Sequence, residues 1–150
     1  MVIQELISLN NIELQFNPHT KDEAIEALAK ILLKNQEIND LKGFLNDVYE
    51  REAITSTGIG YGIAIPHAKS SHVLIPSVIF ARSDEGVPFD AMDGKDAHLF
   101  FMIAMPEDGT NAHLKVLAML SRKLMHSDFR EALLDAKTKE EVLVLLYTMN

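Results

Sequence analysis

Leu99-Phe-Phe-Met-Ile-Ala-Met105 is apolar at every position. A strand that is apolar on both faces is typical of a sheet that helices cover on both sides. Residues 62–66 and 77–81 predict two further short strands, and Pro66 must end or bend the first because proline has no N–H for the ladder. Turn-forming residues at 86–94 predict a hairpin or irregular excursion, so the sheet is expected to be mixed rather than purely parallel.

Apolar residues at helical spacing predict helices before and after these strands. Thr20-Lys-Asp-Glu23 and Thr138-Lys-Glu-Glu141 are capping boxes, so helices should begin directly after Thr20 and Thr138. Further helices are expected over residues 2–9, 40–52, 114–125 and 129–134, and a half-buried strand over 12–16. The prediction is an α/β, doubly wound sandwich with a mixed β-sheet covered by helices on both faces, in a single domain spanning residues 1–150.

Composition excludes several classes of function. The chain has 14 Lys and Arg against 22 Asp and Glu, a formal charge of −8, and no basic stripe, which argues against a nucleic-acid partner and against an anionic membrane surface. No apolar stretch approaches the ~20 residues of a membrane span, and no secretory signal opens the chain, so a cytoplasmic location without membrane insertion is expected. The absence of cysteine excludes thiol chemistry and cysteine-based zinc sites.

The first candidate for chemistry is His67. It follows Gly58, Gly60 and Gly62 and a short apolar run that ends in Pro66. Alternating glycines allow a backbone to bring its N–H groups close to a ligand, and the exit of a strand is where ligands usually bind in α/β proteins. His67 is therefore expected in an exposed loop beside a donor-rich segment. An ordinary turn followed by a surface histidine is the alternative.

His113 and Arg51 are the other candidates. Residues 108–113 lead into a predicted helix, with Thr110 or Asn111 as its N-cap, which places His113 in the first turn. The helix dipole there favours an anion and keeps the imidazole neutral. Arg51 ends the preceding helix just before the glycine run, and arginine is well suited to bind a phosphate. The alternatives are a surface histidine, and an arginine that pairs with a neighbouring glutamate.

A metal-dependent site is a weaker hypothesis. Such a site would use His67, His72 and His113 with a carboxylate, and a metal-dependent hydrolase would use His67 and His113. Their spacing matches no established zinc motif, so no metal and no cofactor are expected. A module that uses the His67 segment only to bind a partner is a further alternative.

The motifs resemble a known family. Arg51-Glu52, Ser56-Thr-Gly-Ile-Gly60 and Gly62-Ile-Ala-Ile-Pro-His67 are similar to the phosphorylation-site signature of IIA components of the bacterial sugar phosphotransferase system, fructose/mannitol type. Asn111-Ala-His-Leu-Lys-Val-Leu-Ala118 is similar to the family's second histidine segment. The resemblance covers nearly the whole chain and implies the same α/β sandwich.

The resemblance also implies a function. Such a protein accepts a phosphoryl group from the phosphohistidine of the carrier protein HPr and holds it on a histidine, here His67, with His113 and Arg51 as the matching site residues. It then passes the group to a cysteine of a IIB domain, which serves a membrane IIC domain. An open site ringed by Ile59, Tyr61 and Ile63 is expected. Nitrogen-type IIA proteins, which regulate kinases or transporters, share the motif and stay the alternative.

Overall fold

A computed structural model describes residues 2–149 as a three-layered molecule with one mixed sheet in the middle. The sheet has six strands in the order β1-β5-β6-β3-β2, and β4 also pairs with β6. The strands are β1 (Ile12–Glu13), β2 (Gly58–Gly60), β3 (Ile63–Ala64), β4 (His67–Ser70), β5 (Ser77–Val87) and β6 (Ala97–Pro106). β5 and β2 run antiparallel to their neighbours β6 and β3, whereas β3 and β4 run parallel to β6.

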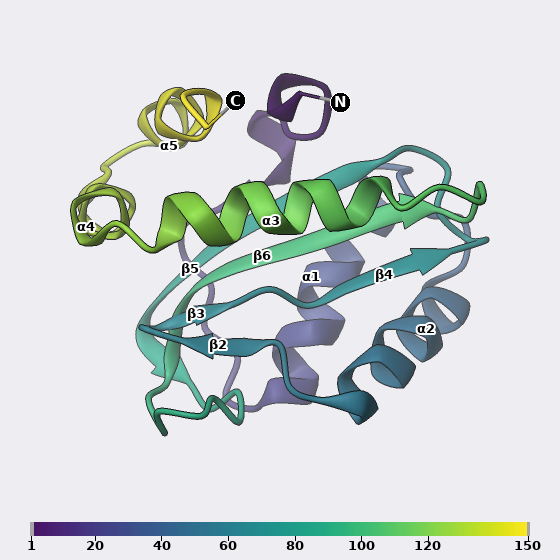
Figure 1. Cartoon of the computed structure of the whole chain (residues 1–150), viewed down its shortest axis with the longest axis horizontal. Coiled ribbons are helices and arrows are strands. Elements are labelled where there is room, and N and C mark those ends of the chain that lie inside the picture. Colours follow the sequence, from purple (N-terminus) through teal and green to yellow (C-terminus); the bar gives the residue numbers. More distant parts are fainter. Residues whose placement is uncertain (1, 150) are drawn as a thin grey trace.

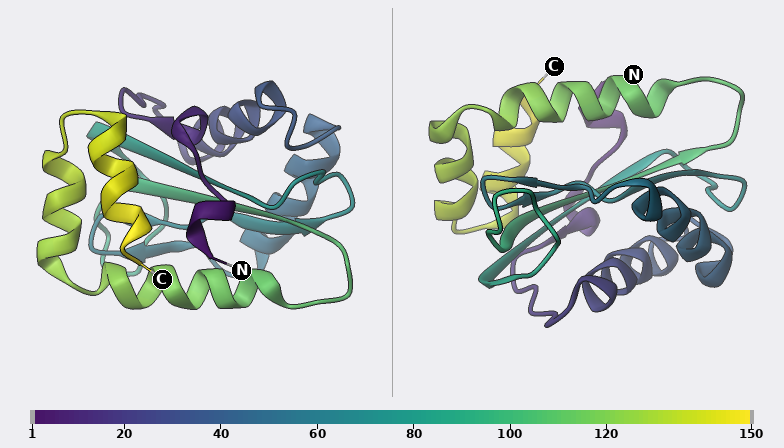
Figure 2. Two further views of the ribbon diagram at one scale, coloured as in Figure 1. Left: turned by 90° about the horizontal axis from the view of Figure 1, so that it is seen from above. Right: turned by 60° about the horizontal axis from the view of Figure 1, so that its bottom comes forward.

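Helices cover both faces of this sheet. The helices are α1 (Lys21–Lys34), α2 (Leu41–Ile54), α3 (Ala112–Leu124), α4 (Ser127–Asp135) and α5 (Lys139–Tyr147). Figure 2 shows α1 and α2 on one side of the sheet, and α3, α4, α5 and the N-terminal segment on the other. The predicted doubly wound α/β sandwich with a mixed sheet is confirmed.

β6 shows why the sheet needs both layers. Leu99, Phe101, Ile103 and Met105 pack into the core under α3, α4 and α5, whereas the residues between them pack into the core over α1 and α2. The side chains of a strand alternate between its faces, so a strand that is apolar throughout buries area on both. No helix among residues 2–149 is both long and apolar enough to cross a membrane.

Both predicted helix starts are capped by the threonine and glutamate of the predicted boxes, although each glutamate accepts from the residue before the N-cap rather than from the N-cap itself. The hydroxyl of Thr20 accepts from the N–H of Glu23 at 3.1 Å, and the Glu23 carboxylate accepts from the N–H of His19 at 2.8 Å. Thr138 and Glu141 make the same pair of bonds at the start of α5. Two otherwise unsatisfied donors are bonded at each start, which explains why these helices begin where the sequence predicts.

The prediction is wrong for the N-terminal segment. Two short 3₁₀ helices, Ile3–Glu5 and Leu9–Asn11, replace the single helix expected over residues 2–9. The backbone is extended at Ser8, whose N–H donates to the side chain of Asn11 at 3.0 Å, so the helical hydrogen bonds stop there. β1 is also shorter than the strand expected over 12–16, although the N–H of Phe16 still donates to the Arg82 carbonyl at 3.1 Å.

Candidate functional site

His67 lies where an interrupted strand resumes. β3 pairs with β6 at Leu99–Phe100, and β4 resumes the parallel pairing with His67 opposite Ile103. Pro66 lies in the gap, and its carbonyl accepts from the N–H of Ile103 at 3.0 Å. His67 is only 6% exposed. The expectation of an exposed loop was wrong, because His67 is the first residue of a buried strand rather than a residue beyond one.

One hydrogen bond sets the chemistry of the His67 ring. Nδ1 lies 2.9 Å from the carbonyl oxygen of Ile65. A carbonyl can only accept, so Nδ1 carries the proton and Nε2 of the neutral ring carries the lone pair. Burial is the main cause that lowers the pKa of His67, and the charges of Arg51 and His113 lower it further. The Ile65 bond and Glu52 oppose this shift without cancelling it, so the neutral form prevails at pH 7.

His113 lies next to His67, at the second position of α3. The two ring centroids are 6.5 Å apart, with 32° between the ring planes. Burial and the charge of Lys69 lower the pKa of His113, in the direction that the sequence predicts. Asn111 is the N-cap residue by position but makes no side-chain cap bond, and the hydroxyl of Thr110 donates to Asp108 instead. The predicted cap position is therefore right, but its expected hydrogen bond is absent.

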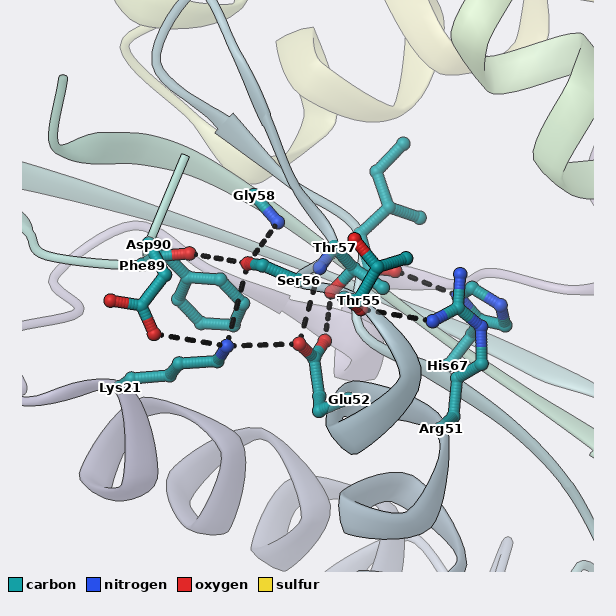
Figure 3. A network of polar contacts seen from close by, with 11 residues as sticks. Lys21, Arg51, Glu52, Thr55, Ser56, Thr57, Gly58, His67, Phe89 and Asp90 are labelled. Atoms are coloured by element: carbon teal, nitrogen blue, oxygen red, sulfur yellow. Dashed lines mark hydrogen bonds and ion pairs between the residues drawn. The ribbon is translucent and has the colours of Figure 1, made fainter. Parts of the chain in front are cut away.

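Arg51 is in the last turn of α2, beside the His67 ring (Figure 3). Its Nη1 donates to the carbonyl of Thr55 at 3.0 Å. That bond uses one of the five N–H groups of the guanidinium. The alternative was a pair of Arg51 with Glu50 or Glu52. The Glu52 carboxylate binds Lys21 at 3.0 Å instead, and the hydrogen bond described for Arg51 goes to the Thr55 carbonyl rather than to Glu50.

The three candidate residues line one open pocket of about 360 Å³. It is lined by Asp47, Glu50, Arg51, Ile54, His67, Ala68, Lys69, His113, Leu114 and Leu117. Ile54 and Leu114 are 78% and 50% exposed, so apolar side chains border the pocket and face solvent. The sequence predicts Arg51, His67 and His113 in separate segments, and the fold brings them together.

The apolar border is not the one predicted from the sequence. Ile63 is buried in the core. The guanidinium carbon of Arg130 lies over the ring of Tyr61, 4.9 Å from the centroid of that ring. Neither residue, nor Ile59, lines the pocket. Two simple signals could have found residues that do. Lys69 follows His67 by two positions on one strand, and Leu117 follows His113 by four positions on one helix.

The glycine run forms a tight turn, and its glycines do not line the pocket of His67. Gly60 pairs with Ile63 across a two-residue turn in which Tyr61 and Gly62 both have positive φ, as in type I′ hairpins. The N–H of Gly58 donates to Ser56 Oγ at 3.0 Å, and the N–H of Tyr61 donates to Asp93 at 2.9 Å. These donors are already occupied, so the expected donor-rich loop is a tight β2–β3 hairpin.

Glu52 connects this hairpin to the site. Its carboxylate accepts from the N–H of Thr57 at 3.1 Å and from the Thr57 hydroxyl, in addition to binding Lys21 (Figure 3). The Glu52 side chain is only 6% exposed. A buried carboxylate is tolerated where it is paired and hydrogen-bonded, and this one has both kinds of partner.

One histidine of the weaker metal hypothesis, His72, lies apart from the other two. His72 is next to Gly43, and its Nδ1 is 3.9 Å from Asp40, away from the pocket that His67 and His113 share. Among residues 2–149, no group of three or more His, Cys, Asp or Glu residues is arranged to hold a metal ion.

Comparison with known proteins identifies the family of this chain. Residues 5–149 match the sequence profile of the family described as "Phosphoenolpyruvate-dependent sugar phosphotransferase system, EIIA 2". The chain belongs to this family. It is 46% identical over 140 residues to the "PTS system fructose-specific EIIA component" of Haloferax volcanii, covering 93% of this chain and 91% of that protein. It is 38% identical over 146 residues to the "PTS system fructose-specific EIIABC component" of Bacillus subtilis, covering 97% of this chain and 23% of that longer protein.

Solved structures agree with this assignment. The nitrogen regulatory protein IIA-Ntr of Neisseria meningitidis superposes with a TM-score of 0.89 and 33% identity, over 96% of this chain and 98% of its own. The mannitol IIA protein of Escherichia coli, in complex with its phosphorylated IIB partner, superposes with a TM-score of 0.82 and 29% identity, over 95% of this chain and 97% of its own.

Proposed function

We propose that this EIIA 2 family member is a phosphoryl carrier that holds the group on Nε2 of His67. The observation that carries the proposal is the 2.9 Å contact between Nδ1 and the Ile65 carbonyl, which leaves the Nε2 lone pair as the nucleophile. The lowered pKa of His67 keeps that lone pair available at neutral pH. The open pocket shared with Arg51 and His113 gives a donor protein access to the ring.

The proposed step needs no external co-reactant. The Nε2 lone pair attacks the phosphorus of a donor phosphohistidine, the new N–P bond forms, and the electron pair of the old N–P bond returns to the donor's ring nitrogen. The proton on Nδ1 stays in place. Because the phosphorylated ring then carries positive charge, its hydrogen bond to the Ile65 carbonyl becomes stronger. No metal is needed for a donor of this kind, and neither a metal nor a cofactor is part of the proposal.

Arg51 and His113 have separate roles in the proposed transfer. The permanent charge of Arg51 and its remaining donors would bind the equatorial oxygens of the phosphoryl group. Nδ1 of His113 is buried and has no hydrogen-bond partner among the described residues, so Nε2 is the nitrogen available to the pocket. A neutral His113 ring with its proton on Nε2 would donate to a phosphoryl oxygen. The buried Nδ1 would then carry only a lone pair and no unsatisfied N–H.

The proposed partners are proteins rather than small molecules. The donor is phospho-HPr, and the acceptor is the cysteine of a IIB domain or subunit that serves a membrane IIC component. The complex of the E. coli mannitol IIA protein with its phosphorylated IIB protein supports the second contact, and fructose-specific relatives favour fructose as the sugar. We propose that residues 1–150 act as one domain and work in the cytoplasm.

The test is an intact-mass measurement after incubation with phosphoenolpyruvate, enzyme I and HPr. The expected result is a gain of one phosphoryl group that requires HPr, is lost in acid and is absent from His67→Asn. A full gain of mass in His67→Asn would exclude His67 as the acceptor.

A regulatory role is the second candidate, favoured by the likeness to the Neisseria nitrogen regulatory protein. If phospho-HPr does not phosphorylate the protein, the donor of the nitrogen-type system is the next to try. Labelling by that donor alone would favour the regulatory branch.

A further inference from the structure

We propose that Glu52 is a positioning residue that places both His67 and Arg51 for phosphoryl transfer. The inference rests on the proposed function of His67, and it assigns to the Lys21–Glu52–Thr57 network a role that reaches beyond the stability of α2. Figure 3 shows this network beside the site.

The first connection runs from Glu52 to His67 through the backbone. Glu52 binds both the N–H and the hydroxyl of Thr57. The carbonyl of the same Thr57 accepts from the N–H of Ile65 at 2.9 Å. The carbonyl of Ile65 in turn accepts from Nδ1 of His67 at 2.9 Å. A displacement of Thr57 is therefore transmitted through a single residue, Ile65, to the acceptor that sets the His67 tautomer.

The second connection runs from Glu52 to Arg51. The chain leaves α2 at Thr55, whose backbone is extended, and the carbonyl of Thr55 accepts from Arg51 Nη1 at 3.0 Å. Two residues farther along, Glu52 holds Thr57 in place. Glu52 is the neighbour of Arg51 on α2. It thus fixes the segment that contains the Thr55 carbonyl, which is the hydrogen-bond partner of Arg51.

Further contacts show that the position of Glu52 is itself fixed. Lys21 binds Glu52 at 3.0 Å and lies 5.0 Å from the centroid of the Phe89 ring. The hydroxyl of Ser56 donates to the Phe89 carbonyl at 2.6 Å. Gly58 lies so close to this carbonyl that an added Cβ would be 2.4 Å from its oxygen. Each of these contacts limits where residues 55–58 can lie.

The Lys21 side of the network offers a matched control. Lys21 has a second carboxylate partner, Asp90, at 3.4 Å, but the Asp90 side chain is 78% exposed, and its described polar contact is with Lys21 rather than with residues 55–57. Asp90→Asn therefore removes one negatively charged partner of the same lysine, and it leaves the bonds between Glu52 and Thr57 in place. Asp90 has a φ of 54°, which asparagine tolerates well.

The experiment compares Glu52→Gln with Asp90→Asn and with the double variant Lys21→Met/Glu52→Gln. The double variant removes the buried charge of Glu52 together with the partly exposed lysine that pairs with it. Single-turnover transfer from phospho-HPr is measured against donor concentration, well below the melting temperature of each variant. Glu52→Gln and the double variant are expected to lose about 10- to 100-fold in the maximal rate, with little change in the half-saturating donor concentration. Asp90→Asn should keep the wild-type rate.

The ¹⁵N signals of His67 provide a readout that a merely structural role would not move. Wild type should show a single tautomer with the proton on Nδ1, and Glu52→Gln should show a mixture of tautomers. Wild-type rates and a single tautomer in Glu52→Gln would overturn the proposal, as would full recovery of the rate in the double variant. If wild type takes no phosphoryl group, the proposed function fails, and the tautomer measurement alone decides whether Glu52 positions the ring.

Discussion

His67→Ala should destabilise the protein as well as remove its acceptor. The side chain is 6% exposed, and its Nδ1–H is the partner of the carbonyl of Ile65, a residue with no exposed surface. An unsatisfied buried carbonyl costs about 1–3 kcal/mol, and the cavity left by the ring adds to this cost. We therefore expect a loss of about 2–4 kcal/mol in the free energy of unfolding.

His67→Asn separates the two effects. The Nδ2 of asparagine is as many bonds from Cβ as the Nδ1 of histidine, so it can donate to the same carbonyl. Urea denaturation should show that the asparagine variant recovers at least half of the stability that alanine loses. Intact mass should show that neither variant accepts a phosphoryl group.

Equal stabilities of wild type and His67→Ala, within about 0.5 kcal/mol, would refute the reasoning, because the Ile65 bond would then hold nothing in place. Equal losses in the alanine and asparagine variants would show instead that ring packing, and not the hydrogen bond, stabilises this part of β4.

Four further predictions follow from the site and its surroundings. His113→Ala should keep the capacity for one phosphoryl group and slow its transfer about 10-fold or more in quenched-flow measurements, since a positioned donor is lost; wild-type rates in both directions would exclude this role. Arg51→Lys should also transfer more slowly despite its retained charge, because lysine lacks the planar fork, and an unchanged rate would show that charge alone suffices. The pKa values of His67 and His113 are lowered in the folded state, so below the ordinary value of about 6.5 the unfolded chain binds more protons. Stability should therefore fall as the pH drops from about 6.5 through the folded pKa values. The difference between the urea midpoints at pH 7 and 5.5 should be smaller in the double variant His67→Ala/His113→Ala than in the wild type. Gly58→Ala should lower the urea midpoint by a loss of about 1–3 kcal/mol, because its Cβ would meet the Phe89 carbonyl oxygen at 2.4 Å, and an unchanged midpoint would show that the hairpin can move aside.

The parts of the fold that could be predicted are those decided by nearby residues. Thr20 and Thr138 bond donors three residues ahead, so both helix starts are visible in the sequence. The apolar run of β6 indicates burial on both faces for the same reason, since alternation along a strand is a local property.

The errors arise where a distant partner decides the outcome. The glycine run looks like a ligand-binding loop until Asp93, more than 30 residues away, occupies the N–H of Tyr61. Arg51 has two neighbouring glutamates, but Lys21 from α1 takes Glu52 and leaves Arg51 to the Thr55 carbonyl. No periodicity within α2 contains that information.

The candidate site could also be predicted only in part from the sequence. The sequence indicates which side chains can do phosphoryl chemistry, but the 6.5 Å between the rings of His67 and His113 depends on how α3 packs over β6, the strand with which β4 pairs. The Nδ1 contact could not be predicted either, because it requires the gap between β3 and β4 to leave the Ile65 carbonyl within reach of the ring.

That gap affects how the site can change during evolution. The group that orients the His67 ring is a main-chain carbonyl, and no single codon change can delete a main-chain carbonyl. Ile65 itself can drift to another apolar residue without altering which nitrogen bears the lone pair. The reactive atom is in this respect protected from genetic variation, while Arg51, His113 and the exposed border of the pocket stay open to selection for different protein partners.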